Sequence, residues 1–173
     1  MKQKLLQFLL IIICFVLQTT IIKEIALANI APNLMITLPV LYGFFNGRRN
    51  GIYVGFTTGF IFDIFYCEIL GLNAFIFMLI GFFSGFFKEH YNKEEMIIPL
   101  IAVLIGDFSY GFINYVFNFL LRNRLDISYY ISNIILPEVV YTLFISILVY
   151  KIVLSLDKLS GKKKERRVTK YVF

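Results

Sequence analysis

The stretch GRRNGIYVGFTTGFIFD, residues 47–63, decides the fold of this chain. Its apolar part has a glycine at every fourth position, and the next step of the same repeat is a carboxylate: Gly51, Gly55, Gly59 and Asp63. Four residues advance an α-helix by about 400°, so these positions form one slowly drifting stripe. In a membrane such a stripe lets two helix backbones approach closely, and a buried carboxylate at its end is costly without a partner. The stretch therefore predicts a membrane helix with one smooth face.

This glycine stripe has two interpretations. It is either a contact within the chain, which we favour, or a docking face for the membrane helix of another protein. The next apolar segment carries Gly81 and Gly85, again four apart, so the two strips can face each other across a hairpin. Arg48 and Arg49 stand in the turn before the stripe. They are predicted to set the membrane topology, with contact to anionic lipid or a cytoplasmic partner as a more specific alternative.

The composition is that of an integral membrane protein. The 173 residues are 59% hydrophobic and 16% charged, against roughly 25% charged in a typical soluble domain. The mean hydropathy is +0.78. No polar segment is long enough for a separate soluble domain, so we expect an all-α polytopic protein made of one helical bundle.

Hydropathy divides this bundle into six predicted transmembrane helices, followed by a basic cytoplasmic tail at 157–173. The predicted spans are residues 5–22, 31–45, 51–66, 72–87, 96–121 and 129–156. The second span is short and contains Pro39, which removes a backbone donor, so we expect neighbouring helices to shelter it or the helix to be broken. Proline at position 137 predicts a kink in the last span.

The charge distribution orients these six spans. Three of the 17 basic residues, Lys23, Arg122 and Arg124, would lie on one side of the membrane, and the other 14 on the side of the two termini. The positive-inside rule therefore predicts that both termini are cytoplasmic. A five-span arrangement with a re-entrant second segment would separate the termini and conflicts with this bias. A cleaved signal peptide ending near the triplet at 26–28 is a further, less favoured alternative.

Three acids fall within apolar spans: Asp63, Asp107 and Glu138. Asp107 shares a polar helix face with Tyr110, Asn114 and Asn118. The functional interpretation is a polar centre that binds a small solute, couples protons or pairs with a partner subunit. The structural one is a set of hydrogen-bonded groups that fix helix packing, which we favour for Asp107.

Catalysis has little support in the sequence. Neither a Ser/His/Asp or Cys/His set, nor a zinc-protease motif, nor a glycine-rich phosphate loop occurs. Cys14 and Cys67 read as small buried hydrophobes, and His90 as a solvated residue without companion ligands. We therefore expect no catalytic residue, no metal, no cofactor and no nucleic-acid partner.

Several ordered motifs resemble one family. They are Ala31-Pro32-Asn33-Leu34, Gly47-Arg48-Arg49-x-Gly51, Gly55-Phe56-x-x-Gly59-x-x-x-Asp63, and Gly71-Leu72-Asn73-Ala74 before Gly81-x-x-x-Gly85. In this order they resemble the rod shape-determining protein MreD family over about residues 30–87, and the later spans match by length and hydropathy.

The resemblance implies a bacterial inner-membrane scaffold or regulator of the cell-elongation (rod) complex, without catalytic activity. Its partners would be MreC, RodA and a transpeptidase, with the MreB filament contacted directly or indirectly, in support of cell shape and peptidoglycan synthesis. The family is similar in fold to the substrate-binding subunit of energy-coupling-factor transporters. This supplies the alternative function, a solute-binding membrane subunit, although the short outer connection at 67–71 leaves little room for a lid over a small-molecule ligand.

Overall fold

The computed structural model describes residues 2–20, 30–67, 70–90, 96–118 and 127–169. For residues 2–3, 89–90, 118 and 158–169 it describes the backbone alone. The described chain is helical and contains no β-strand. Its α-helices are α1 (Lys2–Thr19), α3 (Leu34–Asn46), α4 (Arg48–Tyr66), α5 (Leu72–Ser84), α6 (Ile97–Asn118), α7 (Ile127–Tyr130) and α8 (Leu136–Thr169). Two irregular helices complete them, the 3-10 helix η1 (Gly85–His90) and the π-helix η3 (Ile131–Ile135).

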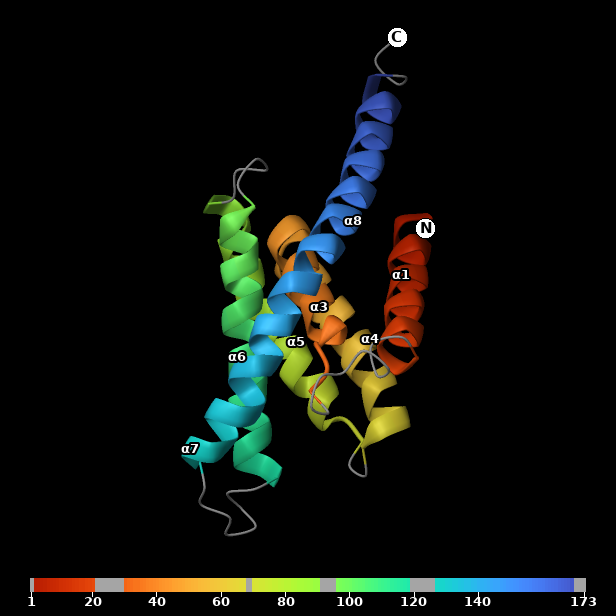
Figure 1. Ribbon diagram of the computed structural model, residues 1–173. Helices are drawn as coiled ribbons and strands as arrows, with labels where there is room; N and C mark the ends of the chain where they lie inside the picture. Colours follow the sequence, from red (N-terminus) through yellow and green to blue (C-terminus); the bar gives the residue numbers. More distant parts are fainter. Residues whose placement is uncertain (1, 21–29, 68–69, 91–95, 119–126, 170–173) are drawn as a thin grey trace.

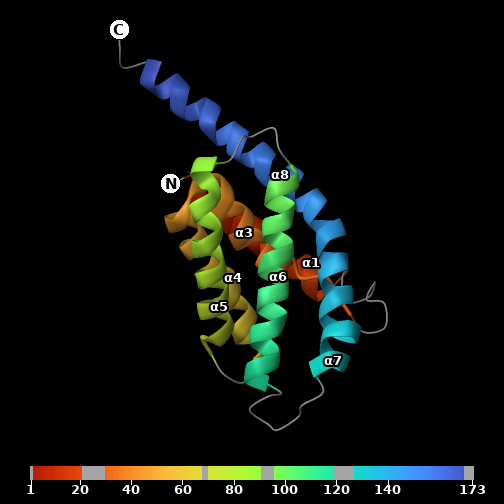
Figure 2. The ribbon, with the colours of Figure 1, turned by 90° about the vertical axis from the view of Figure 1, so that its left-hand side faces the viewer.

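Helix α3 is the centre of the bundle. It contacts α1, α4, α5, α6, α8 and η1, and every residue from Leu34 to Phe45 is buried (Figures 1 and 2). Its 13 residues give a helix of about 20 Å, shorter than the hydrocarbon core of about 30 Å. The prediction that neighbouring helices shelter this segment is confirmed, and the helix continues through Pro39 without a break.

The helices alternate in direction, so that both chain ends lie at the same end of the bundle (Figure 1). The α3–α4 turn lies at this end as well, whereas the ends of α4 and α6 and the starts of α5 and α7 lie at the opposite end (Figure 1). The turn itself is a single residue, Gly47, whose φ of 91° favours glycine. Arg48 and Arg49 were expected in the turn but form the first turn of α4, because Gly47 alone reverses the chain.

Two stretches of the described chain are long and apolar enough to cross a membrane, Ile97–Phe117 and Ile127–Asp157. The other apolar helices, Lys4–Thr19, Leu34–Asn46 and Leu72–Lys88, are shorter. Two of the six predicted spans thus meet this criterion, and the full set of six stays a prediction. The predicted tail at 157–173 is helical as far as Thr169, because α8 continues beyond the apolar segment.

The predicted distortion near Pro137 takes the form of a π-helix. Leu136 donates its N–H to the carbonyl of Ile131, five residues earlier, and η3 ends at this point. Proline lacks the N–H that would continue the regular pattern, and such wide turns are a common way to absorb the mismatch. The helical run from α7 to α8 therefore continues across the proline.

Candidate functional site

The glycine stripe of α4 lies against α5. A Cβ added at Gly51 or Gly55 would come closer than 3.0 Å to the backbone of α5, at Gly81 and Phe77 respectively. At Gly59 it would lie 2.5 Å from the Cα of Ala74. Real Cβ atoms do not approach other atoms so closely, so only glycine permits this backbone-to-backbone contact. The chain's own α5 occupies the face formed by the stripe.

The second strip belongs to the same contact. A Cβ at Gly81 would meet the carbonyl oxygen of Gly51, and one at Gly85 would lie 2.5 Å from the Cα of Arg48. Sequence reasoning missed a third contributor, Gly43 of α3, where a Cβ would lie 2.5 Å from the Gly81 carbonyl oxygen. The sequence did indicate this residue, because Gly43 and Gly47 continue the four-residue glycine spacing toward the N-terminus. Helices α3, α4 and α5 therefore meet at Gly43, Gly51 and Gly81.

Asp63 ends the stripe and caps the neighbouring helix. Its carboxylate is fully buried. Oδ2 accepts from the N–H of Gly71 at 2.9 Å and of Ala74 at 3.0 Å. Oδ1 accepts from the N–H of Asn73 at 3.3 Å and from its side-chain Nδ2 at 2.8 Å. The first N–H groups of a helix have no partner within the helix and favour negative charge, so an acid on α4 serves as the N-terminal cap of α5.

Cys67 lies next to this cap and is half-buried, less enclosed than the sequence predicted. Its Sγ accepts from Nδ2 of Asn73 at 2.9 Å. Burial raises the pKa of the Cys67 thiol, and the adjacent Asp63 carboxylate raises it further. The thiol is therefore held in its protonated form beside the cap. Cys14 is buried in α1, as expected.

Asp107 has the opposite environment. The side chain is 2% exposed, and in the described part of the chain neither carboxylate oxygen has a hydrogen bond of ordinary geometry. The neighbouring Thr142 hydroxyl donates to the carbonyl of Glu138 at 2.8 Å and accepts from the N–H of Asn33 at 3.0 Å. A hydroxyl has one hydrogen to donate, so Thr142, which also interacts with Asp107, can donate to only one of the two oxygens at a time. Among the described residues, the buried carboxylate on α6 therefore has one shared donor at most.

Glu138 brings a second acid near Asp107. It is half-buried in the first turn of α8 and close enough to Asp107 to interact with its charge. Tyr110 is buried one turn along α6, its ring 5.1 Å from that of Phe77, and is hydrogen-bonded to Asn114. The polar face predicted for this helix therefore turns toward α8 at its Asp107 end. The side chain of Asn118, also assigned to that face, lies outside the described residues.

The two arginines remain at the surface. Arg48 is exposed, and its guanidinium lies 3.8 Å from the centre of the Phe86 ring, a cation–π contact within the chain. Arg49 is exposed on the same helical turn. No group of three potential metal ligands occurs in the described part of the chain. The side chain of His90 lies outside that part.

Comparison with known proteins identifies the family. The family model for rod shape-determining protein MreD matches residues 2–159. This chain belongs to the MreD family. The match extends from the first helix through the whole apolar part of α8, beyond the residues that carried the resemblance. No curated protein and no solved structure matches the chain.

Membership in the MreD family gives the broad function. The chain is a membrane protein with a role in rod-shape determination, together with other shape-determining proteins. Its long apolar helices fit insertion into a membrane. The similarity in fold to energy-coupling-factor subunits stays a prediction, and the solute-binding alternative gains no support.

Proposed function

We propose that this protein is a non-catalytic membrane scaffold of the cell-elongation complex. It holds MreC, RodA and a transpeptidase near one another by lateral contacts between membrane helices, and connects them directly or indirectly to the MreB filament. The observation that carries the proposal is the division of the molecule into a closed centre, formed by α3, α4 and α5, and an apolar outer surface.

The closed centre supports this proposal because its small-residue faces already contact other helices of the same chain. The α4 stripe faces α5 and Asp63 caps α5, so these groups stabilise the chain itself. Partner helices would therefore contact the outer faces. We therefore favour a structural role for the glycine stripe over a docking role: the glycines hold α4 against α5, and this packing positions the outer faces that partners contact.

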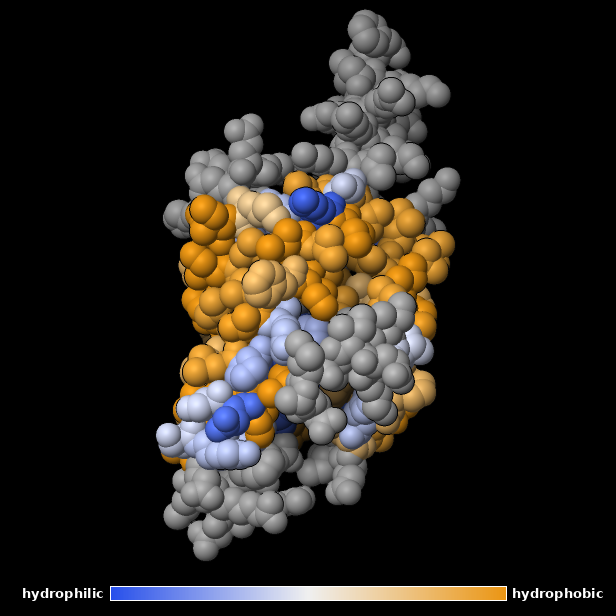
Figure 3. Space-filling model, in the orientation of Figure 1, coloured by the Kyte–Doolittle hydropathy of each residue, from blue (hydrophilic) through white to orange (hydrophobic). Residues whose placement is uncertain are grey.

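The outer surface offers continuous apolar faces for such contacts. On α8 the exposed large side chains recur every four residues, at Leu136, Val140, Phe144, Leu148 and Ile152. Apolar residues cover much of the described surface in the view of Figure 3, with polar residues in its lower half and a smaller hydrophilic group near its upper edge. Membrane helices associate through packing of this kind, in competition with lipid.

The shared location of the chain ends supports a multi-pass arrangement with both termini in the cytoplasm. The two ends lie at one end of the bundle (Figure 1), and the lysine- and arginine-rich positions 158–170 follow the apolar part of α8. Positive charge favours the cytoplasmic side and attracts anionic lipid. The MreB filament is cytoplasmic in the proposed complex, so a basic cytoplasmic end is where a connection to it would form.

The test is purification of the tagged full-length protein from its native membrane in a mild detergent, with mass spectrometry of the co-purifying proteins. We expect MreC together with RodA or the transpeptidase. An untagged strain controls for carry-over, and a strain expressing an unrelated tagged multi-pass protein controls for general membrane contamination. Recovery of transporter ATPases and a coupling subunit in place of these partners would overturn the scaffold and favour the solute-binding alternative.

Site-specific photo-crosslinking identifies the helix that contacts a partner protein. A photo-reactive amino acid at Phe144 of α8 is matched with one at Phe65 of α4, because the two side chains are equally exposed, at 68% and 67%. We expect crosslinks to a partner from Phe144, on the long regular apolar face. Crosslinks from Phe65 alone would move the proposed contact to the α4 side.

A further inference from the structure

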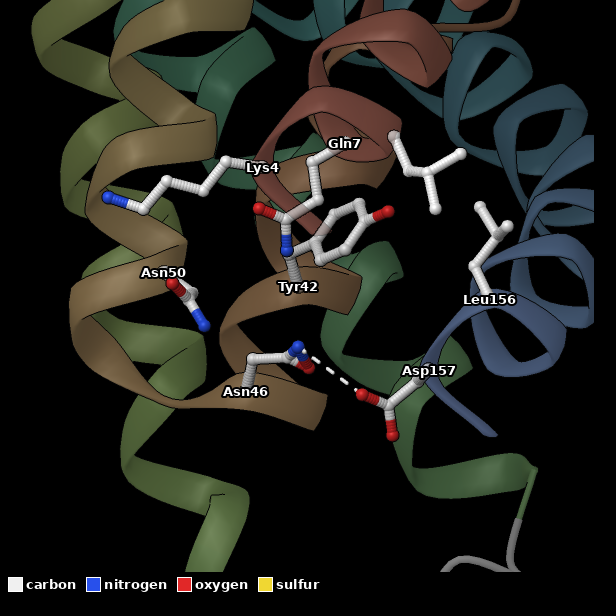
Figure 4. A pocket seen from close by; sticks show the side chains of 8 residues that line it. Lys4, Gln7, Tyr42, Asn46, Asn50, Leu156 and Asp157 are labelled. Atoms are coloured by element: carbon white, nitrogen blue, oxygen red, sulfur yellow. Dashed lines mark hydrogen bonds between the residues drawn. The ribbon is translucent and has the colours of Figure 1, made fainter. Parts of the chain in front are cut away.

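A polar cavity lies at the end of the bundle that holds the chain termini. Its volume is about 120 Å³, and its lining comes from four helices: Lys4, Leu6, Gln7, Tyr42, Asn46, Asn50, Leu156 and Asp157 (Figure 4). One water occupies about 30 Å³ in the liquid, so the cavity has room for about four waters or a small polar group. It is lined by none of the glycines and intramembrane acids described above.

The lining carries opposite charges at its two sides. Lys4 stands on one side and Asp157 on the other, with the amides of Asn46 and Asn50 between them (Figure 4). The Lys4 ammonium lies 5.3 Å from the centre of the Tyr53 ring, on the side away from Asp157. The two charges are thus held apart across the cavity. A ligand that matches them has a negative group and a positive group joined by a short link.

One acceptor in the cavity lacks a donor. Asn46 donates its Nδ2 to Oδ1 of Asp157 at 3.4 Å, but its own Oδ1 is buried and has no hydrogen-bond partner among the described residues. Buried polar atoms are nearly always satisfied, so this one points to a donor from a bound molecule or water. An ammonium group has three N–H donors and would satisfy Asn46 while lying next to the Asp157 carboxylate.

The cavity also borders the apolar surface. Leu6 and Leu156 line it, and the neighbouring face of α1 exposes Leu5, Phe8 and Leu9 at 69%, 50% and 55%. A molecule with its polar group in the cavity could therefore lay an apolar part along α1. Membrane lipids have this division.

We propose that the cavity binds the ammonium end of an aminophospholipid head group, with the phosphate at the cavity rim, from the leaflet on the side of the chain termini. The phosphate lies toward Lys4, and the primary ammonium lies between Asn46 Oδ1 and Asp157. The acyl chains follow the apolar face of α1. This assigns a ligand class to a region that the scaffold function leaves unused, and it does not depend on which proteins the scaffold binds.

The proposal is tested by native mass spectrometry of the full-length protein in detergent, titrated with phosphatidylethanolamine, phosphatidylcholine and phosphatidylglycerol of identical acyl chains. We expect phosphatidylethanolamine to bind at least about tenfold more tightly than the other two, because choline has no N–H donors and glycerol has no positive charge. Equal binding of the three lipids would overturn the proposal. Equal affinity for glycerophosphoethanolamine, which lacks acyl chains, would overturn the assignment to a lipid.

Variants connect the binding to the cavity. Lys4→Gln and Asp157→Asn should each weaken phosphatidylethanolamine binding about tenfold, the size of one hydrogen bond to a charged group. Asp157→Asn keeps an acceptor oxygen for the Asn46 amide, so the fold is retained. Lys88→Gln is the matched control, since Lys88 donates to the Asn46 carbonyl at 3.3 Å at the same end without lining the cavity. An equal effect of all three variants, or of none, would contradict the assigned site.

Discussion

Asp63 and Asp107 are both buried carboxylates on apolar helices, and their surroundings are opposite. Asp63 accepts four hydrogen bonds from Gly71, Asn73 and Ala74. Among the described residues, Asp107 has no hydrogen bond of ordinary geometry, and the hydroxyl of Thr142, which interacts with it, is directed to the Glu138 carbonyl. Burial alone therefore does not tell what an acid does inside a helical bundle. The number of hydrogen-bond donors around the carboxylate distinguishes the two cases.

The source of the donors explains the difference. The donors to Asp63 follow it by eight to eleven residues, at the free N-terminal end of α5, so one hairpin supplies both partners. Asp107 lies in the middle of α6, where backbone N–H groups are used within the helix, and it depends on side chains of α8. The first acid completes the hairpin, whereas the second is a polar group held at a cost in free energy.

The largest loss of stability is expected from Gly59→Leu, which would disrupt the packing of α4 against α5 next to Asp63. A Cβ at position 59 would collide with the backbone of Asn73 and Ala74, the residues that donate to Asp63. Separating the helices should remove both the close contact and the cap, with a loss of about 4 kcal/mol or more in stability. Because the chain has no tryptophan, a fluorescent-protein fusion monitored by size-exclusion chromatography after heating is a suitable measurement.

The control for Gly59→Leu is Phe60→Leu, at the adjacent, exposed position of α4. It should leave the elution profile and the midpoint of heat denaturation unchanged. We expect Gly59→Leu to enter the membrane and to recover fewer partner proteins, as a consequence of misfolding. Equal heat resistance of the two variants would show that α4 and α5 do not meet as described.

The next effect in size is that of Asp63→Asn. The amide keeps one acceptor oxygen and turns an NH2 group toward the N–H donors of α5, so at least one of those donors loses its partner. We expect a loss of about 3 kcal/mol, typical of hydrogen bonds to a charged group together with an unsatisfied donor. The same heating assay measures it. A midpoint equal to that of the parent protein would mean that the cap contributes little.

Asp107→Asn should behave differently, and this difference is the sharpest test of the comparison. The substitution removes a carboxylate that has no well-aligned donor among the described residues and introduces an amide of the same shape. We expect the denaturation midpoint to stay within about 1 kcal/mol of the parent or to rise. A loss as large as that of Asp63→Asn would show that Asp107 has a stabilising partner in the membrane.

The sequence was informative wherever a local pattern determined the outcome. The four-residue glycine spacing predicted a close helix contact, and the shortness of 31–45 together with Pro39 predicted a sheltered helix. The sequence did not show that Asp63 caps α5, because this depends on where the N-terminal end of α5 lies relative to the C-terminal end of α4. It also could not distinguish Asp63 from Asp107, since a donor for Asp107 would have to come from Thr142 of α8, far away in the chain.

The smallest effect concerns Cys67, which reports on the charge of Asp63. The Asp63 carboxylate raises the pKa of the thiol only while it is ionised, in addition to the effect of burial. In a Cys14→Ser background Cys67 is the sole thiol, so the rate of maleimide labelling against pH gives its apparent pKa. We expect the rate to rise at a higher pH than for an exposed cysteine introduced at Leu70, outside the predicted spans, in a Cys14→Ser, Cys67→Ser background. If Cys67 reacted at the same or a lower pH than this control, the proximity of an ionised Asp63 would be contradicted.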